Sequence, residues 1–371
     1  MRAGALTTAR RHAQNMDLPL RGAIVGFGFI AERGHLPAYL AHPERFHITA
    51  VADISPARRA RARELLPQVR LYADAATLLA AESRSLDFVD IATPPSEHAE
   101  IAHAAFDHGL HVLCEKPITT SVLDAQALLA HATAAQRVFF PSHNYRHAPV
   151  VQAVRERVER GDLGTIHLVT LQTFRPTHAK GVSEWQPDWR RVHRYSGGGI
   201  AMDHASHSFY LAFEWLRSYP TAVTAHIEHR SGLDTEDGFS CTATFPTGTA
   251  VTHLTWNAGV RKVIYSLHGD RGALTVEDDE LEISIRTGGA VERISAASDW
   301  MDASHAKWFA TLQSEFIDAI RTEQFVGKNA QDALSSVALV EASYASARDG
   351  SRMTDVAYHA NRRPALATTH G

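Results

Sequence analysis

An acidic residue and a histidine with the spacing of a catalytic pair, Asp203 and His207, follow three glycines at residues 197–199. Residues four positions apart share one face of a helix, so the carboxylate can bind one imidazole nitrogen and leave the other free to accept a proton. A glycine run lets a ligand approach the backbone closely. The pattern predicts a general base at His207, with an Asp–His pair on a solvated helix surface as the alternative.

A lysine that could enter the same chemistry, Lys116, lies in the segment Glu115-Lys116-Pro117 directly after a predicted parallel strand. Open α/β sheets bind ligands at the carboxyl ends of their strands, and the proline stiffens the turn behind the lysine. We therefore expect Lys116 to point into a cleft. The alternative is an exposed ion pair with Glu115, which would contribute little.

A metal site is not expected. His204 and His207 are three residues apart and could share a metal ion, but no acidic third ligand follows at motif spacing. The two cysteines, Cys114 and Cys241, have no CxxC neighbour, which speaks against a thiolate zinc site and a disulfide framework. This cysteine usage fits a reducing cytoplasm.

A dinucleotide site is predicted where a first strand runs into Gly26-Phe27-Gly28-Phe29-Ile30-Ala31, a GxGxxA pattern before a helix. Gly26 permits a tight turn, and Gly28 lets the backbone approach a pyrophosphate at the helix N-terminus. Glycine pairs also occur in turns that bind nothing, so the pattern alone is weak. Asp53, at the end of the second predicted strand, strengthens it, because a carboxylate near this spacing binds the adenosine ribose.

The charge of Asp53 favours NAD over NADP, because a carboxylate repels a 2′-phosphate. Arg58, Arg59 and Arg61 follow on the next predicted helix, and one of them could bind that phosphate if the loop bent. A basic helix face in solvent is the other interpretation of these arginines. We expect NAD, with NADP as the alternative cofactor.

The elements that must position these residues fall into two groups along the chain. From residue 21 to about 140, apolar runs alternate with helical patterns, which indicates a parallel sheet with crossover helices. The predicted strands are residues 22–26, 47–53, 88–92, 110–114 and 138–141, and the predicted helices are residues 56–66, 73–80, 98–108 and 121–136.

After a helix at residues 150–160 the pattern changes to alternating segments typical of an open, mainly antiparallel sheet, with a hairpin turn at residues 246–248. The predicted strands are residues 165–174, 222–230, 238–245, 249–256, 263–268 and 281–286, and residues 308–321 and 329–348 are predicted amphipathic helices. We expect a Rossmann domain over residues 21–146, an α+β domain over residues 147–350, and a tail over residues 351–371.

The composition is that of an ordinary globular protein and excludes several partners. The 371 residues are 44% hydrophobic and 21% charged, with a formal net charge of −4, which does not attract nucleic acid. No apolar stretch is long enough to cross a bilayer. Residues 1–20 are arginine-rich but lack the apolar core of a secretory signal. We expect a disordered extension there, or a true start at Met16, and a transit peptide is the weaker alternative.

These motifs occur together in an order that resembles the Gfo/Idh/MocA oxidoreductase family, named for glucose–fructose oxidoreductase, inositol dehydrogenase and a rhizopine-catabolism protein. The resemblance covers about residues 21–350. Besides the glycine motif, Asp53, the Glu-Lys-Pro segment and the GGG-x3-D-x3-H pattern, it includes Ala92-Thr93-Pro94-Pro95 with His98, His143-Asn144-Tyr145-Arg146, Asp188-Trp189-Arg190 and His268-Gly269-Asp270-Arg271-Gly272.

The resemblance implies a fold and a set of site residues. A Rossmann domain would precede an α+β domain whose open sheet forms a homodimer or homotetramer, with the active site between the two domains. The implied cofactor residues are Gly26, Phe27, Gly28, Phe29, Ile30, Asp53, Ile54, Arg58, Thr93, Pro94, Pro95, His98, Glu115, Lys116, Asn144, Trp189 and Arg190. The implied substrate residues are Lys116, Tyr145, Arg146, His178, Asp203 and His207, of which Lys116, Asp203 and His207 would be catalytic.

The reaction that the resemblance implies is hydride transfer between a nicotinamide cofactor and a carbinol carbon of a sugar, cyclitol or related polyol. His207 would take the hydroxyl proton, Asp203 would orient the imidazole, and Lys116 would stabilise the developing alkoxide. Two alternatives stay open: transient oxidation by NAD during glycoside cleavage, with no net turnover of the cofactor, and a non-catalytic regulator that binds a dinucleotide. Retention of the three catalytic residues argues against the regulator.

The sequence departs from the family pattern at Ala205, where relatives tend to have glycine. A methyl group there fits a helix but could narrow the substrate pocket. Residues 174–185, rich in cationic and aromatic side chains, have no family counterpart that we can align. They predict either a loop that selects the substrate, including one with a carboxylate or phosphate, or an ordinary surface loop.

Overall fold

The structure is a computed structural model that describes residues 19–278, 280–285, 290–296 and 304–357 of the 371. Residues 1–18 of the expected N-terminal extension lie outside the described residues. So do Arg286, the last residue of one predicted strand, and residues 358–371 of the expected tail. No helix within the described ranges is long and apolar enough to cross a membrane.

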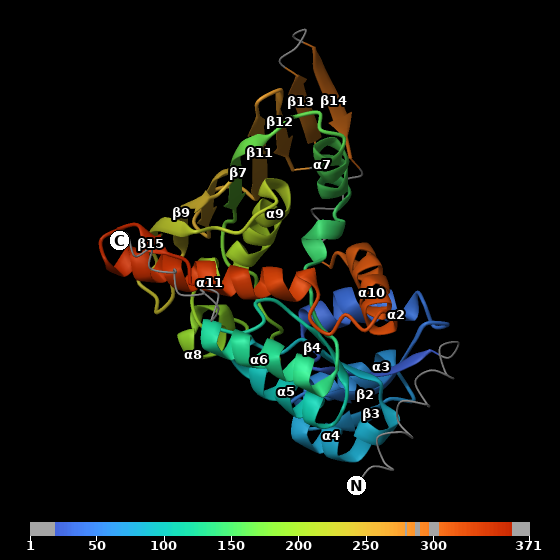
Figure 1. The fold of residues 1–371 in the computed structure, drawn as a ribbon. Coiled ribbons are helices and arrows are strands. Elements are labelled where there is room, and N and C mark those ends of the chain that lie inside the picture. Colours follow the sequence, from blue (N-terminus) through green and yellow to red (C-terminus); the bar gives the residue numbers. More distant parts are fainter. Residues whose placement is uncertain (1–18, 279, 286–289, 297–303, 358–371) are drawn as a thin grey trace, which may run out of the picture.

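Six parallel strands form the first sheet, in the order β3-β2-β1-β4-β5-β6 (Figure 1). They are β1 (Leu20–Val25), β2 (Phe46–Ala52), β3 (Arg70–Tyr72), β4 (Phe88–Ile91), β5 (His111–Cys114) and β6 (Phe139–Pro141). The central strands β4 and β5 are buried along their whole length, as expected for a sheet with helices on both faces. The strand order reverses between β1 and β4, which creates the crevice where such sheets bind ligands.

Helices connect these strands, and several begin at the capping residues that the sequence offers. They are η1 (Ala31–His35), α2 (Leu36–Leu40), α3 (Pro56–Leu65), α4 (Ala75–Glu82), η2 (Ser83–Ser85), α5 (Pro95–Asp107), α6 (Val122–Ala135) and η3 (Asn144–His147). Side-chain oxygens of Ser55, Asp74 and Ser121 accept backbone N–H groups in the first turns of α3, α4 and α6. These caps hold the helix starts in place beside the strand ends.

The second sheet has nine strands in the order β14-β13-β12-β11-β7-β10-β9-β8-β15, all antiparallel neighbours except β7 and β10. They are β7 (Ile166–Phe174), β8 (Ala222–Glu228), β9 (Gly238–Phe245), β10 (Gly248–Thr255), β11 (Lys262–Gly269), β12 (Gly272–Glu277), β13 (Glu280–Ile285), β14 (Val291–Ser295) and β15 (Thr354–Asp355). The predicted hairpin turn joins β9 to β10.

The helices of the second half are α7 (Pro149–Glu159), η4 (Trp189–Arg191), α8 (His193–Ser196), η5 (Ala201–Ala205), α9 (Ser206–Leu216), α10 (Ala306–Arg321) and α11 (Lys328–Arg348). Helix α11 crosses the middle of the molecule and contacts β8, α9 and α6 (Figure 1). Helix α10 follows the second sheet in the chain but returns to the first domain, where Phe316 packs between Phe88 and Phe140, with ring centroids 5.5 and 5.8 Å away. The two sheets are therefore tied together by the C-terminal helices.

The predicted fold class is confirmed: a doubly wound parallel sheet followed by an α+β region with a mixed, mainly antiparallel sheet. Strands β3, β12, β14 and β15 had no counterpart in the predicted elements. Strands β3 and β15 have three and two residues, which is too short for an alternating pattern to show in the sequence.

Candidate functional site

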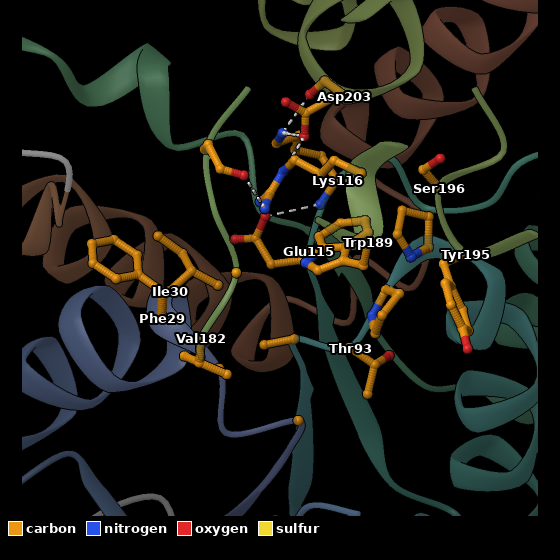
Figure 2. A pocket seen from close by; sticks show the side chains of 18 of the residues that line it. Phe29, Ile30, Thr93, Glu115, Lys116, Val182, Trp189, Tyr195, Ser196 and Asp203 are labelled. Carbon is orange, nitrogen blue, oxygen red and sulfur yellow. Dashed lines mark hydrogen bonds and ion pairs between the residues drawn. The ribbon is translucent and has the colours of Figure 1, made fainter. Parts of the chain in front are cut away.

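A cavity of about 820 Å³ opens at the carboxyl ends of the first-sheet strands and is closed on the other side by residues of the second half of the chain (Figure 2). Its position is the crevice where the strand order of the first sheet reverses. Most residues expected at the site line it: Gly26, Gly28, Phe29, Ile30, Asp53, Ile54, Arg58, Thr93, Pro94, Pro95, Glu115, Lys116, Asn144, Tyr145, His178, Trp189, Arg190, Asp203 and His207.

Three expected residues do not line the cavity. Arg146, expected at the substrate, is buried and forms ion pairs with Asp332 of α11 and Glu214 of α9. It is therefore a structural cation, because its guanidinium compensates buried carboxylates away from the cavity. His98 lies behind the wall, with its ring nitrogens 2.9 Å from the carbonyl oxygens of Thr93 and Pro117.

The third of these residues, Phe27, has a buried side chain and takes part through its backbone N–H, which donates to Asp53 Oδ2 at 2.7 Å. Asp53 Oδ1 accepts a second backbone hydrogen bond, from Ser55 at 2.8 Å. Burial raises the pKa of Asp53, although these bonds and the charge of Arg58 act against it. A carboxylate oxygen can accept more than one hydrogen bond, so Asp53 still has acceptor sites for a ribose hydroxyl.

The glycine turn after β1 meets the geometric needs of a dinucleotide. Gly26 has a φ of +87°, and a Cβ there would lie 2.7 Å from the Thr93 nitrogen, so only glycine fits. A Cβ on Gly28 would meet nothing within 4 Å, which leaves open space where its backbone borders the cavity. With the helical turn η1 starting at Ala31, this segment could hold a pyrophosphate.

The arginines that could have received a 2′-phosphate are engaged within the protein. Arg58 Nε donates to the Phe27 carbonyl at 2.7 Å, and its guanidinium pairs with Glu32 and with Glu184. Arg61 also binds Glu32, at 3.0 Å. Because these contacts would have to break to receive a 2′-phosphate, the geometry fits NAD better than NADP.

Lys116 reaches from the end of β5 to Asp203 on the opposite wall (Figure 2). Its Nζ donates to the Asp203 carbonyl at 2.6 Å and lies 3.8 Å from Asp203 Oδ1, which also accepts from Arg190 Nε at 2.9 Å. Burial alone would raise the pKa of Asp203, but the charges of Lys116 and Arg190 lower it. The carboxylate therefore stays ionised and fixes the lysine at the cavity surface.

The prediction that Asp203 and His207 form a hydrogen bond is wrong. Within the part of the chain that the structure describes, no hydrogen bond joins these two residues; His207 Nδ1 lies 2.8 Å from the Tyr210 hydroxyl instead. Asp203 lies within the π-helical turn η5, and the wider winding of this turn removes the shared face that i and i+4 residues have on an α-helix. Burial first, and then the charge of Lys116, hold the pKa of His207 well below its usual range.

A buried histidine that sequence reasoning missed lies under the same site. His35 Nδ1 is 2.7 Å from Asp90 of β4, and its Nε2 is 3.0 Å from Glu115. Although burial lowers the pKa of His35, the charges of and hydrogen bonds to Asp90 and Glu115 raise it to about 10. The imidazolium keeps Glu115, which lines the cavity, ionised. No sequence motif signals this contact, because the three residues come from separate elements.

Residues 175–182 and Trp185, from the loop that the sequence left between two interpretations, line the cavity. His178 is fixed there: its Nε2 lies 2.7 Å from Asp188 Oδ1, and its Nδ1 accepts from Arg191 Nε at 3.2 Å. Sequence reasoning also missed further lining residues that lie far apart in the chain, namely His204, Trp256, Arg261, His305 and Phe309. The loop is thus a cavity wall, and its cationic and aromatic composition was the signal for it.

Comparison with known proteins agrees with this geometry. The N-terminal model of the Gfo/Idh/MocA family, described as an oxidoreductase family with an NAD-binding Rossmann fold, matches residues 20–143, and the C-terminal domain model matches residues 151–275. Together they cover more than half of the chain.

Two relatives match over nearly their whole length. D-apiose dehydrogenase of Paraburkholderia graminis is 28% identical, with 94% of this chain and 93% of the relative covered. Inositol 2-dehydrogenase of Rhizobium meliloti is 26% identical, with 88% and 96% covered. An inositol dehydrogenase homologue from Azotobacter vinelandii, solved with NAD⁺, superposes with a TM-score of 0.79 at 23% identity over 91% of this chain and 97% of the other. The chain belongs to the Gfo/Idh/MocA family of NAD-binding oxidoreductases.

Proposed function

We propose that the chain transfers a hydride between NAD and a carbinol or carbonyl carbon of a sugar, cyclitol or related polyol. One observation carries the proposal: Lys116 Nζ is fixed against Asp203 in the same cavity that holds the glycine turn and Asp53. An ammonium group in this place can stabilise charge on a substrate oxygen. The names of the relatives, which act on apiose and inositol, support a polyhydroxylated substrate.

The residues around the cavity would have different roles along its length. The glycine turn and Asp53 would hold the pyrophosphate and the adenosine ribose, and Glu115, Asn144, Trp189 and Arg190 would surround the nicotinamide end. NAD, when bound, supplies a hydride acceptor or, in its reduced form, a hydride donor. The chain itself must orient the substrate carbon and move the hydroxyl proton.

Two side chains of the cavity wall are candidates for that proton transfer. The sequence points to His207, a general base that Asp203 would orient. The contacts make Lys116 a second candidate, because Asp203 binds the lysine and not the histidine. Both groups line the cavity.

The test is turnover on a panel of aldoses, cyclitols and sugar acids, with NAD present, followed by the absorbance of reduced nicotinamide. Sugar acids belong in the panel because Arg175 and Arg261 line the cavity. Thermal shift with NAD alone confirms cofactor binding, since a ligand stabilises the folded state. Net NADH with a polyol is the expected result. Substrate loss without net NADH would favour transient oxidation, and silence across the panel with NAD bound would reject the proposal.

An assembly of two or four copies through the second sheet is part of the same proposal. Alternate residues of β10 are buried, whereas Val251 between them is 37% exposed, so one face of the sheet is available for a partner. Light scattering on the purified protein should give the mass of a dimer or tetramer. A monomer mass at micromolar concentration would contradict the proposed assembly.

A further inference from the structure

We propose that the hydroxyl of Tyr210 holds His207 in the tautomer whose proton lies on Nε2, so that His207 donates a hydrogen bond to the substrate oxygen and Lys116 transfers the proton. Tyr210 is thus a positioning residue that acts through His207. The role toward substrate rests on the proposed function, whereas the tautomer is a property of the chain alone.

The hydrogen bonds of Tyr210 determine the direction of its contact with His207. The phenol oxygen is buried and accepts the backbone N–H of Tyr145 at 3.2 Å, and His207 Nδ1 lies 2.8 Å away. These are its only partners among the described residues. A phenol has a single proton to donate. If Nδ1 carried a proton too, the Tyr210 proton would have no acceptor, which is unfavourable for a buried hydroxyl. Tyr210 therefore donates to Nδ1, and the imidazole proton lies on Nε2.

The rings around this contact keep it in place. Tyr145 stacks on His207 with centroids 3.9 Å apart and an interplanar angle of 16°. His143 stacks on Tyr210, with ring centroids 4.2 Å apart and an interplanar angle of 28°. Because stacking fixes both ring planes, Nδ1 stays directed at the hydroxyl. Nε2 is then the nitrogen left for the cavity that His207 lines.

The charges that face His207 keep it neutral. Burial has the largest effect, and Lys116, His204, His143 and His305 add positive or potentially positive neighbours that lower its pKa further. Burial also raises the pKa of Tyr210 well above its usual range, so the phenol does not readily give its proton to Nδ1. A neutral ring with a proton on Nε2 has no lone pair there to accept the substrate proton. It is a hydrogen-bond donor.

Lys116 then completes the proton balance. In the direction of reduction, the carbonyl carbon receives the hydride, and the oxygen takes one proton from the ammonium of Lys116, which becomes an amine. In the direction of oxidation, the amine takes the hydroxyl proton as the hydride leaves the carbon. The Asp203 carbonyl, which binds Nζ at 2.6 Å, can accept an N–H from either form and so keeps the nitrogen in place.

The first test reads the tautomer without any substrate. Protein labelled with nitrogen-15 in histidine is compared with His207→Gln, whose missing signals identify His207 among the 23 histidines. We expect an unprotonated Nδ1 and a protonated Nε2. A proton on Nδ1 in the wild-type protein would overturn the proposal. Tyr210→Phe, which removes the donor, should move the population toward the other tautomer, and an unchanged spectrum would show that Tyr210 is not the cause.

The second test separates a donor from a base, with a substrate found in the panel. The amide of His207→Gln can donate a hydrogen bond but cannot accept the substrate proton, whereas His207→Leu can do neither. We expect kcat/KM of the glutamine variant to stay within about tenfold of wild type with the same pH profile, and the leucine variant to lose about 100-fold. Equal losses in both, with a changed pH profile, would make His207 the base.

Lys116→Met removes the proposed proton donor and should lose about 10³-fold in kcat, measured at saturating NAD because Lys116 is also an expected cofactor residue. Retained turnover would remove Lys116 from the proton step. If no member of the panel is turned over, the proposed function fails, but the histidine spectrum still decides the tautomer. The two failures are therefore distinguishable.

Discussion

Two buried histidines of the same site, His35 and His207, differ in charge: His35 is positive and His207 is neutral. Each lies beside a π-helical turn: His35 ends η1, and His207 follows η5. His35 is held between the carboxylates of Asp90 and Glu115, which raise its pKa to about 10 against the effect of burial. His207 meets a phenol and the positive charge of Lys116, and burial lowers its pKa.

The difference shows that the partners of a buried histidine, more than its burial, decide what it can do. Near neutral pH, His35 is a fixed positive charge that keeps Glu115 ionised at the cavity wall. It is structural, since it has no free nitrogen. His207 is neutral, and its Nε2 takes no part in the contact with Tyr210.

The largest expected difference is in the loss of folding stability when each imidazole is removed. His35→Gln leaves two buried carboxylates without their cation, and we expect the free energy of unfolding to fall by about 3–5 kcal/mol. His207→Gln removes only neutral hydrogen bonding, and its expected cost is about 0.5–1.5 kcal/mol. Urea unfolding of both variants measures this. Equal costs would mean that His35 is neutral in the folded protein.

The pH dependence of stability should also separate the two histidines. A pKa raised from 6.5 to about 10 means that the folded state binds the extra proton between these values. The contribution of His35 is fully present below pH 6.5 and is lost as the pH rises through about 10, at a slope near 1.4 kcal/mol per pH unit.

The measurement for this prediction is urea unfolding at several pH values between about 7 and 9. Other groups titrate in this range, so the quantity to compare is the difference between wild type and His35→Gln. That difference should shrink as the pH rises. The His207→Gln variant serves as the control and should keep the wild-type dependence, because His207 is already neutral in this range. A constant gap between wild type and His35→Gln would contradict a charged His35.

The contrast between these histidines also marks the limit of what the sequence could predict. The glycine turn and Asp53 were predictable because each follows directly on an apolar strand, and strand ends meet at one sheet edge. The strands and helices themselves follow from apolar periodicity and capping residues. The His35 cluster was not predictable, because Asp90 of β4 and Glu115, which follows β5, come from distant parts of the chain.

Two predictions about the site were wrong for the same physical reason: a partner from a distant segment of the chain binds the residue instead. Asp203 was expected to bind His207, but Lys116 and Arg190 lie closer to its carboxylate, and the π-helical turn moves the histidine away. Arg146 follows Tyr145, which does line the cavity, but it is drawn inward by Asp332 of α11. The partner of His207 was within reach, since Tyr210 lies three residues further along the same helix.

The smallest expected effect concerns the two tyrosine hydroxyls that bind these sites. Tyr39 donates to Asp90 Oδ2 at 2.8 Å, and Asp90 is also the partner of His35. A hydrogen bond to a charged group contributes about 1.5–3 kcal/mol, whereas one between neutral groups contributes about 0.5–1.5 kcal/mol. Tyr39→Phe should therefore destabilise the protein by roughly 1 kcal/mol more than Tyr210→Phe.

The same pair of variants separates structure from catalysis. Tyr210→Phe should change the tautomer of His207 and the turnover of the protein, while Tyr39→Phe should leave the His207 spectrum as in wild type. For each variant, urea unfolding measures the stability and the nitrogen-15 spectrum identifies the protonated nitrogen of His207. If Tyr39→Phe also altered the His207 signals, the two histidines would be coupled through the cavity wall, and the separation between a structural and a substrate-facing histidine would not hold.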